Sequence, residues 1–368
     1  MAGKHIVLVG AGHAHLDVIA GAEAFTRRGH RLTVIAPGDF WYSGLATGVA
    51  GGIYPPALDR IDIAALTAKA GGTYHRGVVT GLSSERSRLT LEDGTEVPFD
   101  VVSLDIGSEA PPIPGEAAHP DRCFAVKPVR RIAELRATVE ARAAAGRPTR
   151  IAVAGGGATA AEMAANLEAL GRRIGGRVDV TLLAGGERVL AQLPGRAGAA
   201  AVDALRRRGV LVRTGARVAS VDPDAVRLAN GESIGTDLFV NATGLRPRRL
   251  AVCDLPLDPN GALVLDRHLR SRRDPRVHGG GDCVAIEGHE LPRIGVYAIR
   301  QAPVLARNLL AAAEGGEPAT FEPQARYLWI MNLGDGTGLA MRGGLWWHGR
   351  AAFRLKDWID RRFLAKYA

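Results

Sequence analysis

Apolar residues form two short runs, each leading into a glycine-rich turn and then into an alanine-rich stretch with helical spacing. The runs are Lys4–Gly10 and Arg150–Gly155. A further apolar run follows each helical stretch, LTVIAP at 32–37 and VDVTLLAG at 178–185. Strand, turn, helix and strand in this order form the unit of a parallel, doubly wound α/β sheet. The pattern therefore predicts two such units in one chain.

Each unit is followed by a stretch whose composition predicts short antiparallel strands. The stretches are residues 73–108 and 212–244, with hairpin turns expected at Asp93-Gly94 and Asn230-Gly231. Each stretch closes on an apolar strand that runs into a glycine. This repetition predicts an internal duplication.

The length of 368 residues exceeds what one ordinary core holds, so we assign the duplicated halves to two domains. Proline-rich segments at 111–115 (PPIPG) and 246–249 (RPRR) stand where the chain crosses between the halves, and we expect hinges there. The predicted division is a discontinuous first domain, a second domain inserted in it, and a tail: 1–115 with 250–320, 116–249, and 321–368.

Composition and charge narrow the function classes. Hydrophobic residues make up 46% and charged residues 23%, a globular balance, and the formal net charge is +9. A basic protein meets anionic cofactors, acidic membranes or nucleic acid. The sequence contains no run of Lys and Arg with interleaved aromatic residues that resembles a nucleic-acid module, so we expect no nucleic-acid partner.

The three cysteines, Cys123, Cys253 and Cys283, are widely spaced and form no CxxC pair. The spacing matches neither a redox disulfide motif nor a zinc knuckle, so we expect no bound metal. The sequence contains no stretch of about 18 apolar residues, and the chain enters a strand at residue 4 without a charged and apolar leader. We therefore expect a cytoplasmic protein, with peripheral contact to the inner face of the cytoplasmic membrane left open.

The two glycine-rich turns predict nucleotide binding. Gly10-Ala11-Gly12 stands between a strand and a helix, where glycines permit close backbone approach and free N–H groups face a pyrophosphate. The segment 155–160, GGGATA, is a GxGxxA form of the same fingerprint in the same context. Two such turns indicate two dinucleotides, which suggests a flavin and a nicotinamide. The acidic residue expected about 20 residues later is missing in both units, where Ala36 and Ala184 stand, so NAD and NADP both remain open.

The sequence does not decide the roles of three polar residues, Asp282, His13 and His15. Asp282, in VHGGGD, either accepts hydrogen bonds from a sugar or ribityl hydroxyl or caps the following helix. His13 and His15 do not share a helix face, so they do not form a metal pair. His15 occupies the slot of the usual third glycine. We expect it to hold the helix off its strand or to pack beside the pyrophosphate.

The tail from 345 to 368, LWWHGRAAFRLKDWIDRRFLAKYA, combines aromatic and basic residues at helical spacing. A basic amphipathic helix with Trp suits a membrane interface. Docking on the first domain or a dimer interface is the alternative.

Stretches along nearly the whole chain resemble the pyridine nucleotide-disulfide oxidoreductase superfamily. The resemblance is strongest to its type II NADH dehydrogenase and sulfide:quinone reductase side, and within it to the branch fused to selenophosphate synthetase. The stretches are VLVGAGHAHL, YSGLATGVAGG, FDVVSLDIGS, AVKPV, GGGATAAEMA, VNATGLRPR, GGGDCVAI, GVYAIRQAPVLARNL and KDWIDRRF. The implied fold is two Rossmann-like dinucleotide-binding domains with a short C-terminal helical tail.

The resemblance implies FAD in the first domain and NADH or NADPH in the second. The candidate cofactor-binding residues are Gly10, Gly12, His13, Ala14, His15, Ala36, Gly107, Gly155, Gly157, Ala160, Gly244, Gly281, Asp282, Val296, Tyr297 and Arg300. Two departures from the family pattern stand out. Asp105-Ile106-Gly107 replaces the usual ATG, and Val296 stands where quinone-reducing enzymes carry a Gln.

The implied activity is electron transfer from NAD(P)H through FAD to an acceptor, with a quinone as the first choice. The candidate catalytic residues are Glu162, matching a family Glu near both cofactors, Lys127 of the AVKP stretch, and Cys283 beside Asp282. Two alternatives stay open: flavin-dependent oxidation of a sulfur or selenium compound, and a non-catalytic flavoprotein that binds a partner. A homodimer is also left open.

Overall fold

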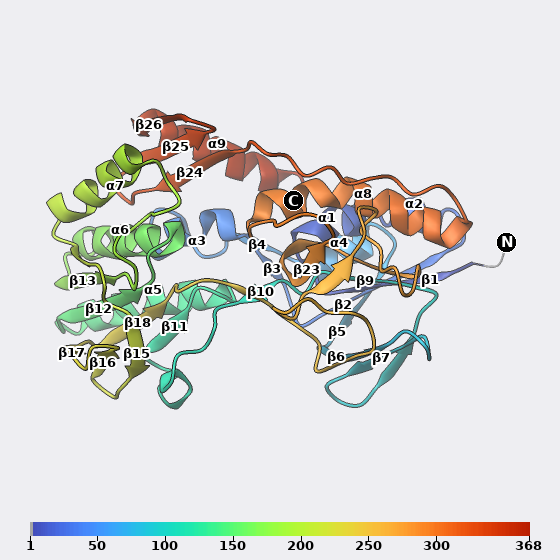
Figure 1. The fold of residues 1–368 in the computed structure, drawn as a ribbon, viewed down its shortest axis with the longest axis horizontal. Coiled ribbons are helices and arrows are strands. Elements are labelled where there is room, and N and C mark those ends of the chain that lie inside the picture. Colours follow the sequence, from blue (N-terminus) through green and yellow to red (C-terminus); the bar gives the residue numbers. More distant parts are fainter. Residues whose placement is uncertain (1–2) are drawn as a thin grey trace.

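The computed structural model describes residues 3–368 and contains two five-stranded parallel sheets, one in each half of Figure 1. The first sheet consists of β1 (His5–Val9), β2 (Arg31–Ala36), β5 (Thr73–Arg76), β9 (Val101–Leu104) and β22 (Val277–Gly279), in the spatial order β22-β9-β1-β2-β5. The second consists of β11 (Cys123–Ala125), β12 (Thr149–Ala154), β13 (Val178–Leu183), β14 (Leu211–Arg213) and β18 (Leu238–Asn241), in the order β11-β18-β12-β13-β14.

The two sheets share one connectivity. Strand β1 leads through α1 (His13–Ala20) into β2, and β12 leads through α6 (Ala158–Arg173) into β13. An antiparallel meander follows β5 and β14 in turn, namely β6 (Val79–Ser83), β7 (Arg88–Leu91) and β8 (Glu96–Pro98), and β15 (Val218–Val221), β16 (Ala225–Leu228) and β17 (Ser233–Gly235). Strands β9 and β18 then return to pair with β1 and β12. The predicted duplication is therefore confirmed.

Helices pack on both sheets, and strands at the centre of each sheet are buried. The first half carries α1, α2 (Glu23–Thr26), α3 (Ser43–Ala50), α4 (Ile63–Lys69) and α8 (Gly295–Glu314), and the second carries α5 (Arg130–Ala144), α6 and α7 (Gly195–Arg207). Every residue of β9 and β18 is buried, as expected for a parallel strand covered on both faces. Val9 stands opposite Leu104 in the ladder, which places Gly10 and Asp105 at the same edge of the first sheet.

Helix α3 lies between the two cores. Its Leu45 and Val49 belong to the core of the first half, whereas Ala46 and Ala50 belong to that of the second. Small alanines on one face let α3 approach α5 and α6 closely. The halves are thus packed together through a helix as well as joined by the chain.

The two crossings between the halves pair with each other. Strands β10 (Ser108–Glu109) and β19 (Arg246–Pro247) are antiparallel, and Arg246 Nη2 lies 2.7 Å from Glu109 Oε1. The domain boundaries and hinges that the sequence predicts lie next to this pair of strands. Both remain predictions. The remaining short elements are β3 (Phe40–Trp41) with β4 (Arg60–Ile61), η1 (Glu116–Ala118), β20 (Val252–Cys253) beside β6, β21 (Leu263–Leu265) with β23 (Val284–Ile286), and η2 (Gly281–Cys283).

The tail is more than the predicted helix. Three antiparallel strands precede it, β24 (Leu328–Asn332), β25 (Gly338–Arg342) and β26 (Leu345–Gly349), and α9 (Arg350–Ala365) follows. The predicted helix is confirmed, and the three strands before it were not predicted. A turn with Gly334 and Gly336 at φ of 79° and 81° joins apolar runs of strand-forming residues. In Figure 1 the tail, in red, runs along the top of the molecule over both halves.

Candidate active site

The first glycine turn is shaped by the end of β9. A Cβ at Gly10, whose φ is +84°, would lie 2.3 Å from the Asp105 carbonyl oxygen. At Gly12 it would lie 2.2 Å from Asp105 Oδ1. No side chain fits at either position, so the two glycines allow the turn to touch Asp105 while its other side stays open. Helix α1 begins at His13, directly after the turn.

A cavity of about 900 Å³ opens at this turn. Its volume lies within the range of cofactor and ligand pockets. Both halves and the tail contribute to its wall. Predicted site residues that line it are Gly10, Gly12, His13, Ala36, Gly107, Lys127, Glu162, Gly281, Asp282, Val296 and Arg300.

Asp282 faces this cavity from the start of η2. Ser108 Oγ donates to Asp282 Oδ2 over 2.6 Å, and the Gly281 amide donates to Gln301 Oε1 over 2.7 Å. These bonds fix the loop that presents the carboxylate. Of the two sequence-based alternatives, the position suits a carboxylate that accepts hydrogen bonds from a polar ligand.

Helix α8 points its N-terminus at the cavity. Gly295, Val296, Ala298, Ile299 and Arg300 line the wall. The unpaired amides and the dipole of a helix N-terminus stabilise negative charge. This end of the cavity therefore suits an anion or a ring that becomes anionic on reduction.

Lys127 reaches the cavity between the two carboxylates Asp105 and Asp282. Burial lowers the pKa of its ammonium group, while the two carboxylates act in the opposite direction. Lys127 thus brings positive charge close to two of the acids that line the cavity.

Glu162 enters the same cavity from helix α6 of the second half. The Asn332 amide of the tail donates to Glu162 Oε1 over 2.6 Å. Burial raises the pKa of Glu162 to about 7, although Lys356 acts to lower it. A carboxyl group with this pKa can take up or release a proton near neutral pH.

Helix α9 completes the wall with residues that the sequence reasoning did not single out. Lys356 Nζ donates to the Gly44 carbonyl oxygen over 2.6 Å and to Asp360 Oδ2 over 2.7 Å. The Tyr42 hydroxyl donates to Asp360 Oδ1 over 2.8 Å. The signal was present in the KDWIDRRF stretch, where Lys356 and Asp360 are four residues apart and share a helix face.

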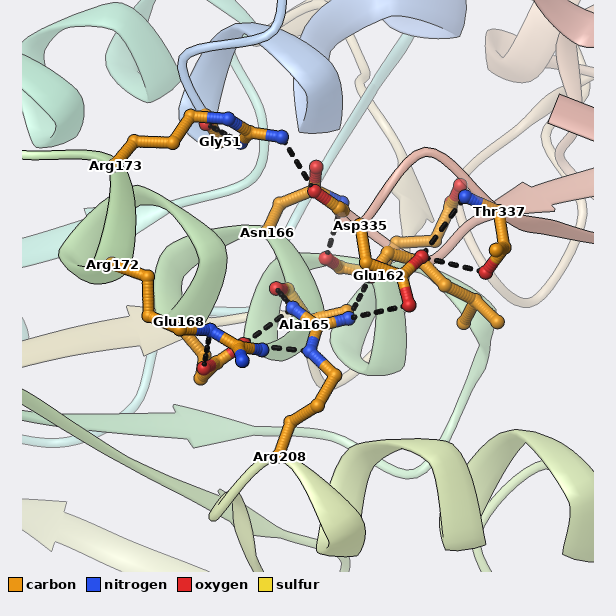
Figure 2. Close-up of polar contacts among 12 residues, drawn as sticks. Gly51, Glu162, Ala165, Asn166, Glu168, Arg172, Arg173, Arg208, Asp335 and Thr337 are labelled. Carbon is orange, nitrogen blue, oxygen red and sulfur yellow. Dashed lines mark hydrogen bonds and ion pairs between the residues drawn. The ribbon is translucent and has the colours of Figure 1, made fainter. Parts of the chain in front are cut away.

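Ionic contacts hold the tail hairpin against α6 (Figure 2). Arg208 bonds to the Glu168 carboxylate and to the Leu333 carbonyl oxygen, and it donates to the Ala165 carbonyl oxygen over 2.7 Å. Arg173 donates to the Gly334 carbonyl oxygen over 2.7 Å. Since Asn332 belongs to this hairpin, the network also fixes the amide that holds Glu162.

His13 and His15 serve different surroundings. His13 packs edge-on against Phe40, with ring centroids 4.8 Å apart, and near Tyr42 and Phe363. Burial lowers its pKa to about 3, so its ring is neutral. His13 is therefore part of the aromatic wall of the cavity.

His15 lies behind the turn and outside the lining of the cavity. Its Nδ1 donates to the Gly10 carbonyl oxygen over 2.7 Å, and Nε2 lies 2.8 Å from Ser103 Oγ. Burial lowers its pKa to about 4, so the neutral ring accepts from Ser103. The expectation that His15 packs beside the pyrophosphate is therefore not supported, because the ring braces the turn against β9.

Three further candidates also point away from the cavity. The Ala14 amide donates to Asp105 Oδ2 over 2.8 Å. The Tyr297 hydroxyl donates to the Gln324 carbonyl oxygen over 3.1 Å. The Cys283 thiol is buried against the carbonyl oxygens of Gly280 and Leu104, and burial raises its pKa to about 12. A thiol held protonated is a poor nucleophile, so the position of Cys283 argues against a catalytic role.

The second glycine turn has the predicted shape but lies apart from the cavity. Gly155 has a φ of +142°, and a Cβ there would lie 2.2 Å from the Ala242 carbonyl oxygen. Gly157 precedes the first residue of α6, where a Cβ would meet open space. Gly155, Gly157, Ala160 and Gly244 lie outside the lining of the cavity, whereas Thr159 and Glu162 of the same helix reach it.

These features fit two dinucleotides. Each turn brings backbone close through glycine and opens on a helix N-terminus, the donor set that a pyrophosphate needs. Among residues 3–368, no group of three or more His, Cys, Asp or Glu side chains is placed to hold a metal ion. In the same part of the chain, no helix combines the length and apolar character needed to cross a membrane.

Known proteins with similar sequences include oxidoreductases. The model of the pyridine nucleotide-disulphide oxidoreductase family matches residues 4–304. The chain is 30% identical over 186 residues to a type II NADH:quinone oxidoreductase of Haemophilus influenzae, covering 47% of this chain and 42% of that protein. It is 27% identical over 239 residues to a rubredoxin-NAD(+) reductase of Alcanivorax borkumensis, covering 63% and 58%. The chain spans about half the length of these two relatives.

Solved structures with a similar fold include the sulfide:quinone oxidoreductase of Aquifex aeolicus. The TM-score is 0.81 at 16% identity, covering 99% of this chain and 91% of that chain. At this identity the likeness concerns the fold, and it confirms the predicted class of two Rossmann-like dinucleotide-binding domains.

Proposed function

Because the chain belongs to the pyridine nucleotide-disulphide oxidoreductase family, we propose that it is an FAD-dependent oxidoreductase that passes electrons from NAD(P)H through FAD to a quinone. The family membership confirms the resemblance read from the sequence, and FAD and NAD(P)H are the cofactors of this family. Membership of the branch that is fused to selenophosphate synthetase remains a prediction. What we propose for this chain is its activity and its electron acceptor.

One observation carries the proposal. The cavity at the first glycine turn also contains Glu162 from the second half and Lys356 from the tail. Bound FAD would supply the chemistry of hydride acceptance from NAD(P)H and of electron transfer to an acceptor. A single cavity that receives groups from all three parts of the chain supports contact between the two cofactors and an acceptor.

The proposed FAD site uses the first half of the chain. Gly10 and Gly12 hold the turn open for the pyrophosphate, and Asp282 accepts hydrogen bonds from flavin hydroxyls. The N-terminus of α8 and Lys127 stabilise negative charge that develops on the reduced ring. The residues assigned to this FAD-binding domain are 1–115 and 250–320.

The proposed NAD(P)H site uses residues 116–249. Gly155 follows β12, Gly244 lies shortly after β18, Gly157 precedes α6, and Ala160 lies in the first turn of α6. Glu162, four residues into the same helix, reaches the cavity. The turn would hold the phosphates of the dinucleotide, and Glu162 would then lie on the side of its reactive ring.

Glu162 and Lys356 are the groups that we propose to handle protons. Quinone reduction consumes protons, and Glu162 has a pKa of about 7. Lys356 is held by Asp360, so its ammonium group stands at a fixed place in the wall. Both groups are partly exposed to the cavity, which gives them access to the acceptor.

Oxidation of a sulfur or selenium compound is less well supported. Burial raises the pKa of Cys123 to about 11 and of Cys283 to about 12. Reactive cysteines sit in electropositive, partly exposed places that lower their pKa. The two thiols are buried instead, and their pKa values are raised.

We also propose that the tail touches a membrane surface. Strand β26 exposes Leu345 (77%) and Trp347 (39%), α9 exposes Trp358 (58%), and Arg362 lies over the Trp358 ring. Trp and Arg together suit the boundary between lipid headgroups and acyl chains. The opposite side of α9 docks on the first half, since Tyr42 and Phe363 stack with centroids 4.5 Å apart.

Anaerobic mixing tests the main proposal. The purified flavin-loaded protein is combined with NADH, NADPH or sulfide in separate runs, and flavin absorbance is followed. We expect at least one nicotinamide to bleach the flavin within seconds, and a soluble quinone to restore the colour. Bleaching by sulfide alone would replace this proposal with the sulfur reaction. Absence of bleaching by all three would leave a non-catalytic flavoprotein.

A further inference from the structure

Asp105 occupies an unusual place at the first glycine turn. It follows β9, and its side chain fills the gap between two glycines that line the cavity. A Cβ at Gly12 or at Gly281 would lie 2.2 or 2.3 Å from Asp105 Oδ1. The side chain is 3% exposed. The close fit shows that the turn is built around this carboxyl group.

The carboxyl group binds the first turn of α1. The amides of Ala14 and His15 donate to Asp105 Oδ2 over 2.8 and 3.2 Å. Amides in the first turn of a helix are also the donors that make its N-terminus attractive to a phosphate. When ionised, Asp105 therefore places a negative charge at the end of the helix that is to receive the pyrophosphate.

The surroundings disfavour that charge. Helix α1 contributes neutral histidine rings, η2 contributes a second carboxylate and a protonated thiol, and the loop after β11 contributes a single ammonium group: His13, His15, Asp282, Cys283 and Lys127. Burial is the main cause that raises the pKa of Asp105 to about 7, and Asp282 adds to it. The acid thus changes protonation within the physiological range.

We propose that Asp105 is a positioning residue whose protonation sets the affinity of the first turn for FAD. In either form its oxygen accepts from the helix amides and keeps the turn in place. When Asp105 is neutral, the positive end of the helix dipole attracts the pyrophosphate. When Asp105 is ionised, its negative charge repels the pyrophosphate. The inference rests on the proposed placement of FAD at Gly10 and Gly12.

The sign of the pH dependence follows from this repulsion. Bound pyrophosphate raises the pKa of Asp105 further, because a nearby negative charge disfavours ionisation. FAD binding is then accompanied by proton uptake above pH 7. The dissociation constant of FAD should rise with pH from about 7, by at most tenfold per pH unit.

Dilution of the flavin-loaded protein provides the test. Released FAD is measured by its fluorescence at pH 6.0 and pH 8.5, calibrated against free FAD at each pH. We expect the dissociation constant to be about tenfold higher at pH 8.5 for the wild type. Asp105→Asn keeps an oxygen acceptor without the charge, so this change should disappear and FAD should bind at least as tightly as at pH 6.0.

Asp59→Asn is the matched control. Asp59 is another buried acid, and burial raises its pKa to about 7, but it lies outside the lining of the cavity. This variant should keep the pH dependence of the wild type.

Three outcomes separate the inference from the proposed function. A wild-type constant that changes less than twofold between the two pH values would overturn the inference without any variant. An Asp105→Asn protein with unchanged pH dependence would do the same. Failure of the wild type to bind FAD at either pH would instead overturn the proposed FAD site.

Discussion

His15 shows how a buried polar side chain can brace a glycine-rich turn from behind. It joins the Gly10 carbonyl oxygen to Ser103 of β9. We expect His15→Leu to lower the free energy of unfolding by about 2–3 kcal/mol at pH 7.5, because it leaves the buried Ser103 hydroxyl and Gly10 carbonyl without partners. Urea unfolding measures this loss.

The same variant carries a pH signature. The pKa of His15 falls from 6.5 to about 4 on folding, so the wild type loses stability as pH falls through 6.5, when the unfolded chain binds a proton that the folded chain does not. His15→Leu removes this loss. The difference between the two proteins should therefore shrink by about 2 kcal/mol at pH 5. A constant difference from pH 7.5 to pH 5 would show that His15 is not held neutral.

Glu162 gives a prediction for turnover. Its raised pKa of about 7 means that it is protonated below that pH and ionised above it. If it donates a proton to the acceptor, quinone reduction should slow as pH rises through 7. Glu162→Gln should lower kcat by about 100-fold and remove this pH dependence, while the flavin content stays at one per chain. A stopped-flow and steady-state series from pH 5.5 to pH 8.5 checks both effects.

At the residue scale, the sequence predicted the glycines and Asp282 better than it predicted the acids around them. Glycine positions follow from backbone sterics that a local motif records. Asp105 appeared only as a departure from a familiar motif, because its partners at Ala14 and His15 are about 90 positions away. Lys356 and Asp360 required knowledge of where α9 docks. Long-range packing, which a short motif does not encode, decides such roles.

Among the elements, the hairpin of β24 and β25 depends on a buried ion pair. Arg208 and Glu168 have side chains 9% and 8% exposed. We expect Arg208→Met to destabilise the protein by about 3 kcal/mol, because it leaves Glu168 poorly compensated in the interior. Arg177→Met is the control, since Arg177 pairs with Asp179 at the surface and is 76% exposed. That variant should change stability by no more than about 0.5 kcal/mol.

Helix α9 and strand β26 supply the proposed membrane contact. Leu345→Ser combined with Trp358→Ser should reduce co-sedimentation with anionic vesicles by about tenfold, because both large apolar side chains are exposed. Val252→Ser removes an apolar side chain that is 67% exposed elsewhere and should leave vesicle binding unchanged. Equal pelleting of all three proteins would contradict the membrane contact.

The strands of the tail escaped the sequence analysis for a physical reason. Residues 328–332 and 338–342 are short apolar runs, for which periodicity alone does not separate strand from helix. Charged residues at helical spacing allowed α9 to be predicted from the sequence. The hairpin instead depends on the glycines in its turn and on contacts with α6. The duplicated halves were easier to predict because the strand–turn–helix–strand unit spans roughly 30 residues and occurs twice.

Across the whole molecule, the tail joins the two cores. Phe321 and Tyr367 belong to the core of the first half, and Met331, Leu333 and Leu339 belong to that of the second. We therefore expect one cooperative unfolding transition, with release of flavin coinciding with loss of helical signal. Phe363→Ala weakens the docking of α9 on the first half and should separate the two transitions by roughly 5 °C. Flavin fluorescence and far-UV circular dichroism, recorded in one thermal scan, compare them.

The pairing of β10 with β19 has a consequence for how such a chain can be assembled. The residues that leave the first half and those that return to it stand side by side, as Ser108 opposite Pro247. The segment between them is thus an insertion whose two ends are adjacent. If it were removed, a short linker could join the remaining ends at little cost in conformational entropy. A recombination event at this ladder can remove or exchange the inserted half without altering the order of strands in its host.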